Sequence, residues 1–144
     1  VVDIANANAE QYSYASLMQR FKQAQQQYQP TVNHIFQQLK ESALEKSLHS
    51  IGVSWGNRLE RQAQVFIPVY MAMGGTASEA LDHLLATKVF RRGKVTGRYD
   101  TRNEKIEAIL FNLEKIWEEL GFTESPETSW ELLQQDIERL KGNL

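Results

Sequence analysis

The chain has 144 residues, of which 42% are hydrophobic and 24% are charged, and its formal net charge is −2. This length suits one domain, and the composition is that of a globular protein rather than of a disordered tail or a strongly basic nucleic-acid binder. Cysteine is absent, which excludes disulfide bonds, thiolate nucleophiles and thiolate metal sites.

The first residues, Val1 to Asn6, lack a Met, a basic region and an apolar region, so they do not form a signal peptide. They look like a cut made inside a longer protein. No apolar run approaches the roughly 20 residues that a membrane helix needs, so we expect no membrane partner. Since the absence of cysteine suits a reducing compartment, we expect the protein in the cytoplasm.

Apolar residues recur with helical spacing nearly throughout, and no segment alternates like a strand. A first helix is expected from an N-cap at Ser13 to just before Pro30, with a Gln-rich polar face over residues 23–29. One face of this helix is apolar and holds Tyr14, Leu17, Met18, Phe21 and Tyr28. A second apolar stripe over residues 32–43 predicts another helix, which ends near His49.

A third helix is expected from Ser54 to Met73, with a stop at Gly74-Gly75. Pro68 lies inside it and predicts a kink or a split into two helices. The segment from Thr76 to Glu79 has the spacing of a capping box and opens a fourth helix. That helix carries the apolar stripe Ala80, Leu81, Leu84, Leu85 and Val89. A basic loop over residues 91–100 follows.

A second capping box, Thr101 to Glu104, opens the clearest helix of the chain, which ends at Gly121. Its stripe consists of Ile106, Ile109, Leu110, Leu113, Ile116 and Leu120. The last helix starts near Thr128 and closes at Gly142, with Trp130, Leu133, Ile137 and Leu140 along one narrow face. This face is short for a coiled coil, so we expect it to pack on the bundle.

The sequence therefore predicts an all-α fold, a single bundle-like domain of five to seven helices. It is expected to consist of leading helices over residues 1–50 and a helical core over residues 51–144, as the C-terminal part of a longer protein.

Common catalytic signatures are missing. The chain has no phosphate-binding loop ending in Gly-Lys-Ser/Thr, no His-Glu-x-x-His and no Gly-x-Ser-x-Gly. His34 and His83 have no second histidine three or four residues away, so no metal site is expected. Asp82 precedes His83, but adjacent helical residues point to different faces. No residue is assigned a catalytic role, and the chain alone is not expected to be an enzyme.

Two features carry candidate binding residues, and the first is a pair of arginines. A glycine-containing turn places Arg58 and Arg61 at the start of a helix, where the macrodipole disfavours each cation by about 0.3–1 kcal/mol. Such a placement is useful where the arginines meet a phosphate. In the alternative interpretation, both pair with Glu60 or with acids elsewhere in the chain.

The second feature is the basic segment 88–105, in which Asp100 and Glu104 are the only acids. Its candidate contacts for a phosphate or a nucleic acid are Lys88, Arg91, Arg92, Lys94 and Arg98. Cations at a helix C-terminus are also ordinary partners of the helix dipole. In the basic loop over residues 91–100, Tyr99 is the only aromatic residue, so a platform for base stacking is poorly supported.

In this order, the two features resemble the C-terminal helical lid of AAA+ ATPases, particularly the McrB-like branch. There, a helix that opens with an arginine, the sensor-2 region, precedes a helix with an Ala-Leu-Asp…Lys-Val-Leu-Pro-Lys…Gly pattern. The matching residues are Ser54 to Arg61, then Ala80-Leu81-Asp82, then Lys88-Val89-Phe90-Arg91-Arg92, with Gly93 or Gly97 as the glycine. The likeness covers roughly residues 50–120. Arg91 departs from the pattern's proline, and Trp55 stands three residues before Arg58 instead of next to it.

The resemblance implies a non-catalytic lid or regulatory domain of a nucleotide-driven machine. Arg58, or else Arg61, would reach the γ-phosphate of a nucleotide and sense ATP against ADP. The implied partners are an upstream ATPase core and the copies of a homo-oligomeric ring. ATP or GTP with Mg²⁺ would bind in the parent protein, and no cofactor is implied for the fragment. Two alternatives stay open: a nucleic-acid-binding helical module that uses residues 88–105, and a protein–protein scaffold that uses an exposed stripe on the first or last helix.

Overall fold

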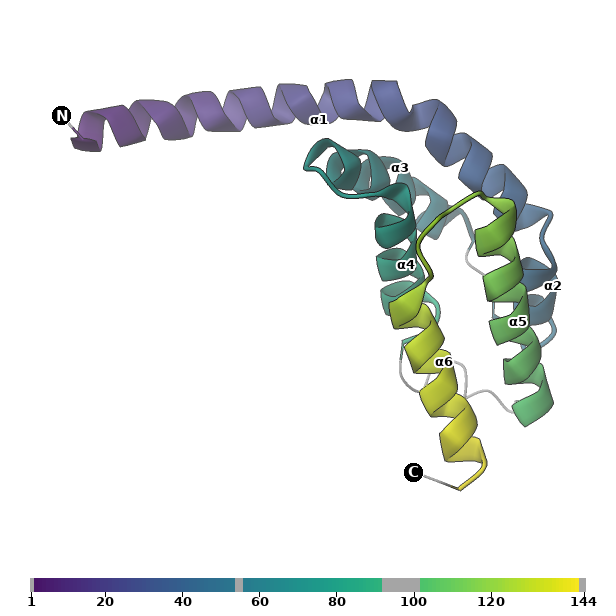
Figure 1. Ribbon diagram of the computed structural model, residues 1–144. Helices are drawn as coiled ribbons and strands as arrows, with labels where there is room; N and C mark the ends of the chain where they lie inside the picture. Colours follow the sequence, from purple (N-terminus) through teal and green to yellow (C-terminus); the bar gives the residue numbers. More distant parts are fainter. Residues whose placement is uncertain (1, 54–55, 92–101, 143–144) are drawn as a thin grey trace.

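Helices account for most of the residues that the computed structural model describes, which are 2–53, 56–91 and 102–142, with side chains from Tyr14 onward (Figure 1). Within these ranges six helices and no strand are found. They are α1 (Val2–Lys40), α2 (Ala43–His49), α3 (Gly56–Ala72), α4 (Ala77–Lys88), α5 (Asn103–Glu119) and α6 (Glu127–Leu140). The predicted all-α, bundle-like fold of five to seven helices is confirmed.

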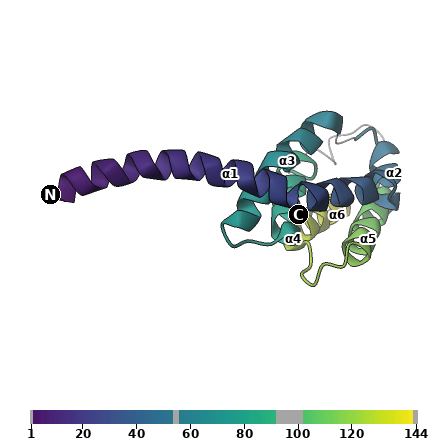
Figure 2. The ribbon, with the colours of Figure 1, turned by 90° about the horizontal axis from the view of Figure 1, so that it is seen from above.

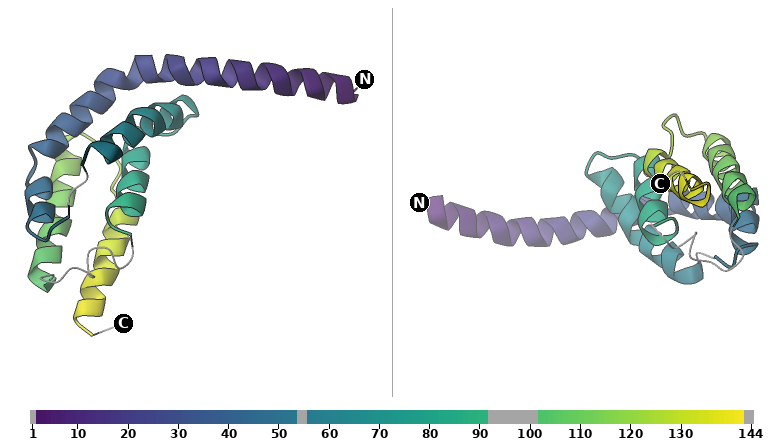
Figure 3. Two further views of the ribbon diagram at one scale, coloured as in Figure 1. Left: turned by 180° about the vertical axis from the view of Figure 1, so that it is seen from behind. Right: turned by 90° about the horizontal axis from the view of Figure 1, so that it is seen from below.

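The C-terminal half of α1 lies on the body of the domain, and its N-terminal half projects beyond the other helices (Figures 1 and 2). On the body, α1 packs against α3 and α2, α3 packs against α4, and α2 packs against α5. Helix α6 contacts both α4 and α5. The views from behind and from below show the same projecting end (Figure 3). We call residues 2–21 of α1 the arm.

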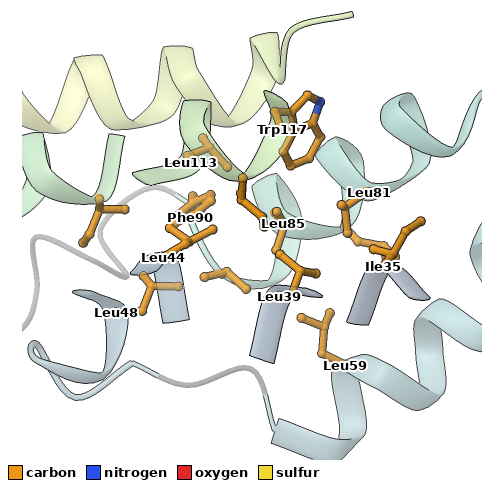
Figure 4. Close-up of a cluster of buried hydrophobic side chains, with 14 of the residues drawn as sticks. Ile35, Leu39, Leu44, Leu48, Leu59, Leu81, Leu85, Phe90, Leu113 and Trp117 are labelled. Atoms are coloured by element: carbon orange, nitrogen blue, oxygen red, sulfur yellow. The ribbon is translucent and has the colours of Figure 1, made fainter. Parts of the chain in front are cut away.

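The core forms where the C-terminal half of α1 meets the other helices (Figure 4). The large side chains that are less than 2% exposed come from five helices and from Phe90, just after α4. They are Phe36, Phe90, Leu39, Leu44, Leu48, Ile67, Leu81, Leu85, Ile106, Ile109, Leu113 and Ile116. Burying one such side chain stabilises the fold by about 1.5–3 kcal/mol, so the core residues of α1 anchor that helix firmly.

The two helices predicted on either side of Pro30 are a single helix, so that prediction is wrong. Pro30 removes one backbone hydrogen bond, but the apolar stripe continues with helical spacing on both sides and favours continuity. Helix α1 bends over the body along its length (Figure 1). The helix also ends at Lys40, not near His49, because Ser42 caps a separate helix and its Oγ accepts the Glu45 N–H at 3.3 Å.

The proline inside α3 does not divide that helix either. Helix α3 runs from Gly56 to Ala72 through Pro68, and the chain turns at Gly74 with φ 99°, as predicted. Its predicted start, Ser54, lies outside the described residues.

The N-cap of the first predicted capping box, Thr76, is confirmed, and the N-cap of the second is displaced. Thr76 Oγ1 accepts the Glu79 N–H at 3.1 Å at the start of α4. The N-cap of α5 is Arg102, which makes no side-chain cap bond to a described residue. Thr101, the predicted cap, lies outside the described residues. The stop at Gly121 is confirmed by its φ of 76°.

Helix α6 receives its N-terminal cap from another helix. Asp82, on α4 and only 8% exposed, accepts the N–H of Thr128 at 3.0 Å through Oδ2 and the N–H of Ser129 at 2.9 Å through Oδ1. The Ser129 hydroxyl donates to the Asp82 carbonyl at 3.2 Å. A carboxylate at a helix N-terminus satisfies free N–H groups and interacts favourably with the dipole. Asp82 therefore ties α6 to α4.

We expect Asp82→Ala to lower the free energy of unfolding by about 1–3 kcal/mol, because two N–H groups at the start of α6 lose their acceptor. Urea denaturation followed by far-UV circular dichroism measures this change. Glu119→Ala is the matched control, since Glu119 is exposed on α5 and its loss should change the value by less than about 0.5 kcal/mol. Equal midpoints for Asp82→Ala and the unmodified chain would contradict the capping role.

Candidate interaction surface

The apolar stripe of α1 is buried on the body and bare on the arm. Tyr14 is 70% exposed, Leu17 44% and Met18 43%, whereas Val32 and Phe36 are at most 1% exposed. Tyr14 precedes Val32, and Met18 precedes Phe36, by eighteen residues, which is five turns at 3.6 residues per turn. The bare and the buried residues therefore belong to the same helix face. We call Tyr14, Leu17, Met18 and Phe21 the arm stripe.

The arm stripe leads into a hollow between α1 and α3. This α1–α3 hollow has a volume of about 780 Å³ and is lined by Phe21, Arg58, Arg61, Gln62, Val65, Phe66 and Val69. Its lining is mainly apolar, and Val65 is 52% exposed. A contiguous exposed apolar surface of this kind is typical of a site where another molecule binds.

The structure brings the two candidate arginines together at this hollow. Arg58 and Arg61 are both exposed and both line it. In the alternative interpretation, Glu60 is a partner of both arginines. Its carboxylate pairs instead with Lys40 Nζ on α1 at 2.7 Å. Among the described residues, no carboxylate forms an ion pair with either arginine. Both guanidinium groups are thus available to an anionic partner.

The basic segment is only partly described. Lys88 ends α4 and is exposed, as is Arg91, while Val89 and Phe90 between them are buried in the core. The other candidates of that segment, Arg92, Lys94 and Arg98, lie outside the described residues. Neither Lys88 nor Arg91 lines the α1–α3 hollow.

A second hollow, between α5 and α6, was missed by the sequence reasoning. Its volume is about 720 Å³, and its apolar lining consists of Trp117, Phe122, Pro126 and Trp130. Five glutamates surround these residues: Glu114, Glu118, Glu124, Glu127 and Glu131. We call it the acidic hollow. The excess of acids after residue 114 was the only signal in the sequence, and these carboxylates repel phosphate groups.

Hydrogen bonds fix the two tryptophans of the acidic hollow. The indole Nε1 of Trp117 donates to Ser78 Oγ of α4 at 2.8 Å. The indole Nε1 of Trp130 donates to Glu114 Oε1 of α5 at 2.8 Å. The apolar face predicted for the last helix is partly confirmed, because Leu133 and Ile137 on it are buried whereas Trp130 is 38% exposed.

The histidines are not gathered into a site within the described residues. His34, His49 and His83 are exposed, and the ring of His83 stacks on Phe66 with centroids 5.3 Å apart. No group of three or more His, Asp or Glu in the described part of the chain is placed to hold a metal ion. Among the described helices, none has the length and apolarity needed to cross a membrane.

Tyr70 on α3 and Glu79 on α4 form a titratable contact between these two helices. The Tyr70 hydroxyl donates to Glu79 Oε2 at 2.9 Å, and this hydrogen bond raises the pKa of Tyr70 above its ordinary value of 10.0. Partial burial and the negative charge of Glu79 raise the same pKa further. The phenol therefore keeps its proton at pH values where a free tyrosine is deprotonated. Its hydrogen bond to Glu79 of α4 persists over the same pH range.

Comparison of the chain with protein-family models, curated protein sequences and solved structures found no match. The resemblance to AAA+ lids therefore stays a prediction.

We expect Glu79→Gln to lower the pKa of Tyr70 towards 10.0, because the phenol loses a charged acceptor. Since the folded pKa is the raised one, the contact stabilises the fold below pH 10.0 and is lost as the pH rises through the raised pKa. Tyrosinate absorbance across a pH titration measures the shift. Tyr70→Phe identifies which part of the curve belongs to Tyr70. Identical curves for Glu79→Gln and the unmodified chain would contradict the assignment.

Proposed function

We propose that this chain is a non-catalytic helical interaction domain that binds a protein partner through the arm stripe and the α1–α3 hollow. The observation that carries the proposal is the change in exposure along one helix face. Val32 and Phe36 are buried by the body, whereas Tyr14 and Met18, five turns earlier, are not.

The energetics support a partner. Isolated helices are marginal in water, and most helices in proteins gain their stability by packing an apolar face. The arm has such a face and no cover from the described part of the body. Each large apolar side chain of the stripe contributes about 1.5–3 kcal/mol when it is fully buried, so a protein that covers several of them stabilises both the arm and the complex.

A second candidate function is the AAA+ lid, and one observation favours it. Arg58 and Arg61 are exposed side by side and form no ion pair with any described residue, which suits a role in contacting the phosphates of a nucleotide. In this function the nucleotide, ATP or GTP with Mg²⁺, lies between the chain and an upstream ATPase core, and Arg58 senses its γ-phosphate. For the nucleic-acid alternative, two of the five candidate contacts, Lys88 and Arg91, lie among the described residues.

For the interaction domain, we expect a photo-crosslinking amino acid at Leu17 to form a discrete protein adduct in cells, because Leu17 lies at the centre of the arm stripe. Mass spectrometry of the adduct identifies the partner. The matched control is the same amino acid at Phe111, which is 66% exposed on α5, away from the stripe. The proposal is wrong if Leu17 yields no adduct or if Phe111 yields the same one.

For the lid, the measurement is the ATPase rate of the parent protein, provided that a phosphate-binding loop lies upstream. We expect Arg58→Ala to lower the rate about tenfold, which corresponds to roughly 1.4 kcal/mol of activation free energy. Lys115→Ala, an exposed change on α5, is the control. An unchanged rate in Arg58→Ala removes Arg58 as the sensor, and the absence of such a loop removes the lid function altogether.

A further inference from the structure

We infer that the partner on the arm is a second copy of this chain, and that the two arms pack antiparallel about a twofold axis at Leu17 and Met18. The inference rests on the proposed function, since it names the occupant of the same surface. Three features of the chain support it: the spacing of the arm stripe, the distribution of charge along α1, and the position of the α1–α3 hollow.

The spacing of the arm stripe is the same when it is read in either direction. From Tyr14 the next large apolar residues follow after three, one and three positions, at Leu17, Met18 and Phe21. In an antiparallel pair centred between Leu17 and Met18, Tyr14 of one copy therefore meets Phe21 of the other, and Leu17 meets Met18. A twofold interface requires such self-complementarity, because each contact occurs twice with the roles exchanged.

The charges of the chain fit the same arrangement. Residues 1–19 contain Asp3 and Glu10 and neither Lys nor Arg. The adjoining surface is cationic, with exposed Arg20 at the end of the arm and exposed Lys22, Arg58 and Arg61 on the body. Antiparallel packing carries the acidic end of one arm past the cationic surface of the other copy. Parallel packing would instead place like charges together, which is unfavourable.

The α1–α3 hollow provides the surface on which an incoming arm ends. It begins at Phe21, the last residue of the stripe, and continues over Val65 and Val69 of α3. An arm that crosses the stripe of its partner must pass this hollow, because the hollow continues the same apolar surface towards the body. The arm of each copy thereby covers apolar residues that its own body leaves bare.

Sedimentation velocity of the purified chain tests the second copy. We expect the mass to rise with concentration from 16.6 kDa towards twice that value. Leu17→Gln with Met18→Gln should raise the dissociation constant at least about tenfold, as loss of a central apolar contact does at protein interfaces. Both side chains are exposed in the single copy, so the fold should be unaffected. Phe111→Gln is the matched control and should leave the dimer intact.

Engineered cysteines test the antiparallel geometry cleanly, because the chain contains none of its own. We expect the double variant Tyr14→Cys, Phe21→Cys to form a covalent dimer on mild oxidation. Tyr14→Cys alone should not, because the two copies of position 14 lie about 10 Å apart along the helices. Efficient crosslinking by Tyr14→Cys alone would indicate parallel arms and would overturn the arrangement.

A charge exchange tests the orientation independently. The double variant Arg58→Glu, Arg61→Glu should weaken self-association at low salt. Mixing it with the double variant Asp3→Lys, Glu10→Lys should restore binding, because each arm then faces a surface of opposite charge. No restoration would overturn the proposed path of the arm. A chain that stays monomeric at high micromolar concentration refutes the second copy as the partner. A crosslink from Leu17 to a different protein would then leave the proposed interaction function standing. The absence of any crosslink would refute the second copy and the interaction function together.

Discussion

The packing of one face of α1 is the constraint on which the rest of the structure depends. Helix α1 provides the surface on which α2 and α3 assemble, and α3 in turn positions α4. Val32, Ile35, Phe36 and Leu39 on that face are at most 2% exposed. Amphipathic helices are stabilised mainly by packing of this kind. Helix α1 is therefore part of the body only over the residues whose apolar face the other helices cover. The arm extends the same face beyond these residues, so its apolar residues Tyr14, Leu17 and Met18 are exposed instead of forming part of the core.

The buried carboxylate of Asp82 links α4 to α6, one of the two helices on which the acidic hollow depends. Asp82 fixes the start of α6 on α4, and α6 then forms the acidic hollow together with α5. Among the described residues, the α1–α3 hollow and the acidic hollow differ in charge, because Arg58 and Arg61 line the first and five glutamates line the second. An anionic segment fits only the first. No described residue of the basic segment 88–105 lines the α1–α3 hollow, so the difference in charge between the two hollows comes from Arg58 and Arg61 and from the five glutamates.

The sequence predicted the features that depend on local spacing, such as the buried stripes of α4 and α5 and the cap at Thr76. The local rule failed at Pro30, because the burial of several large side chains of α1 outweighs the cost of about 3 kcal/mol that a proline has inside a helix. The bond from Asp82 to Ser129 joins residues that lie 47 positions apart. Periodicity contains no information about such a contact. For the same reason the spacing of Tyr14, Leu17 and Met18 marked an apolar face without showing whether the body covers it.

The two candidate functions make incompatible demands on the same residues. A twofold pair of arms is a closed interface, whereas a AAA+ ring requires head-to-tail contacts that repeat around an axis. In the twofold pair, Arg58 and Arg61 face the acidic arm of the second copy, and a nucleotide would have to displace that arm to reach them. In the lid, the same arginines must stay open towards an upstream core. One pair of guanidinium groups cannot bind the acidic arm of a second copy and the phosphates of a nucleotide at once. The anion that pairs with Arg58 and Arg61 therefore decides between the two functions of the α1–α3 hollow.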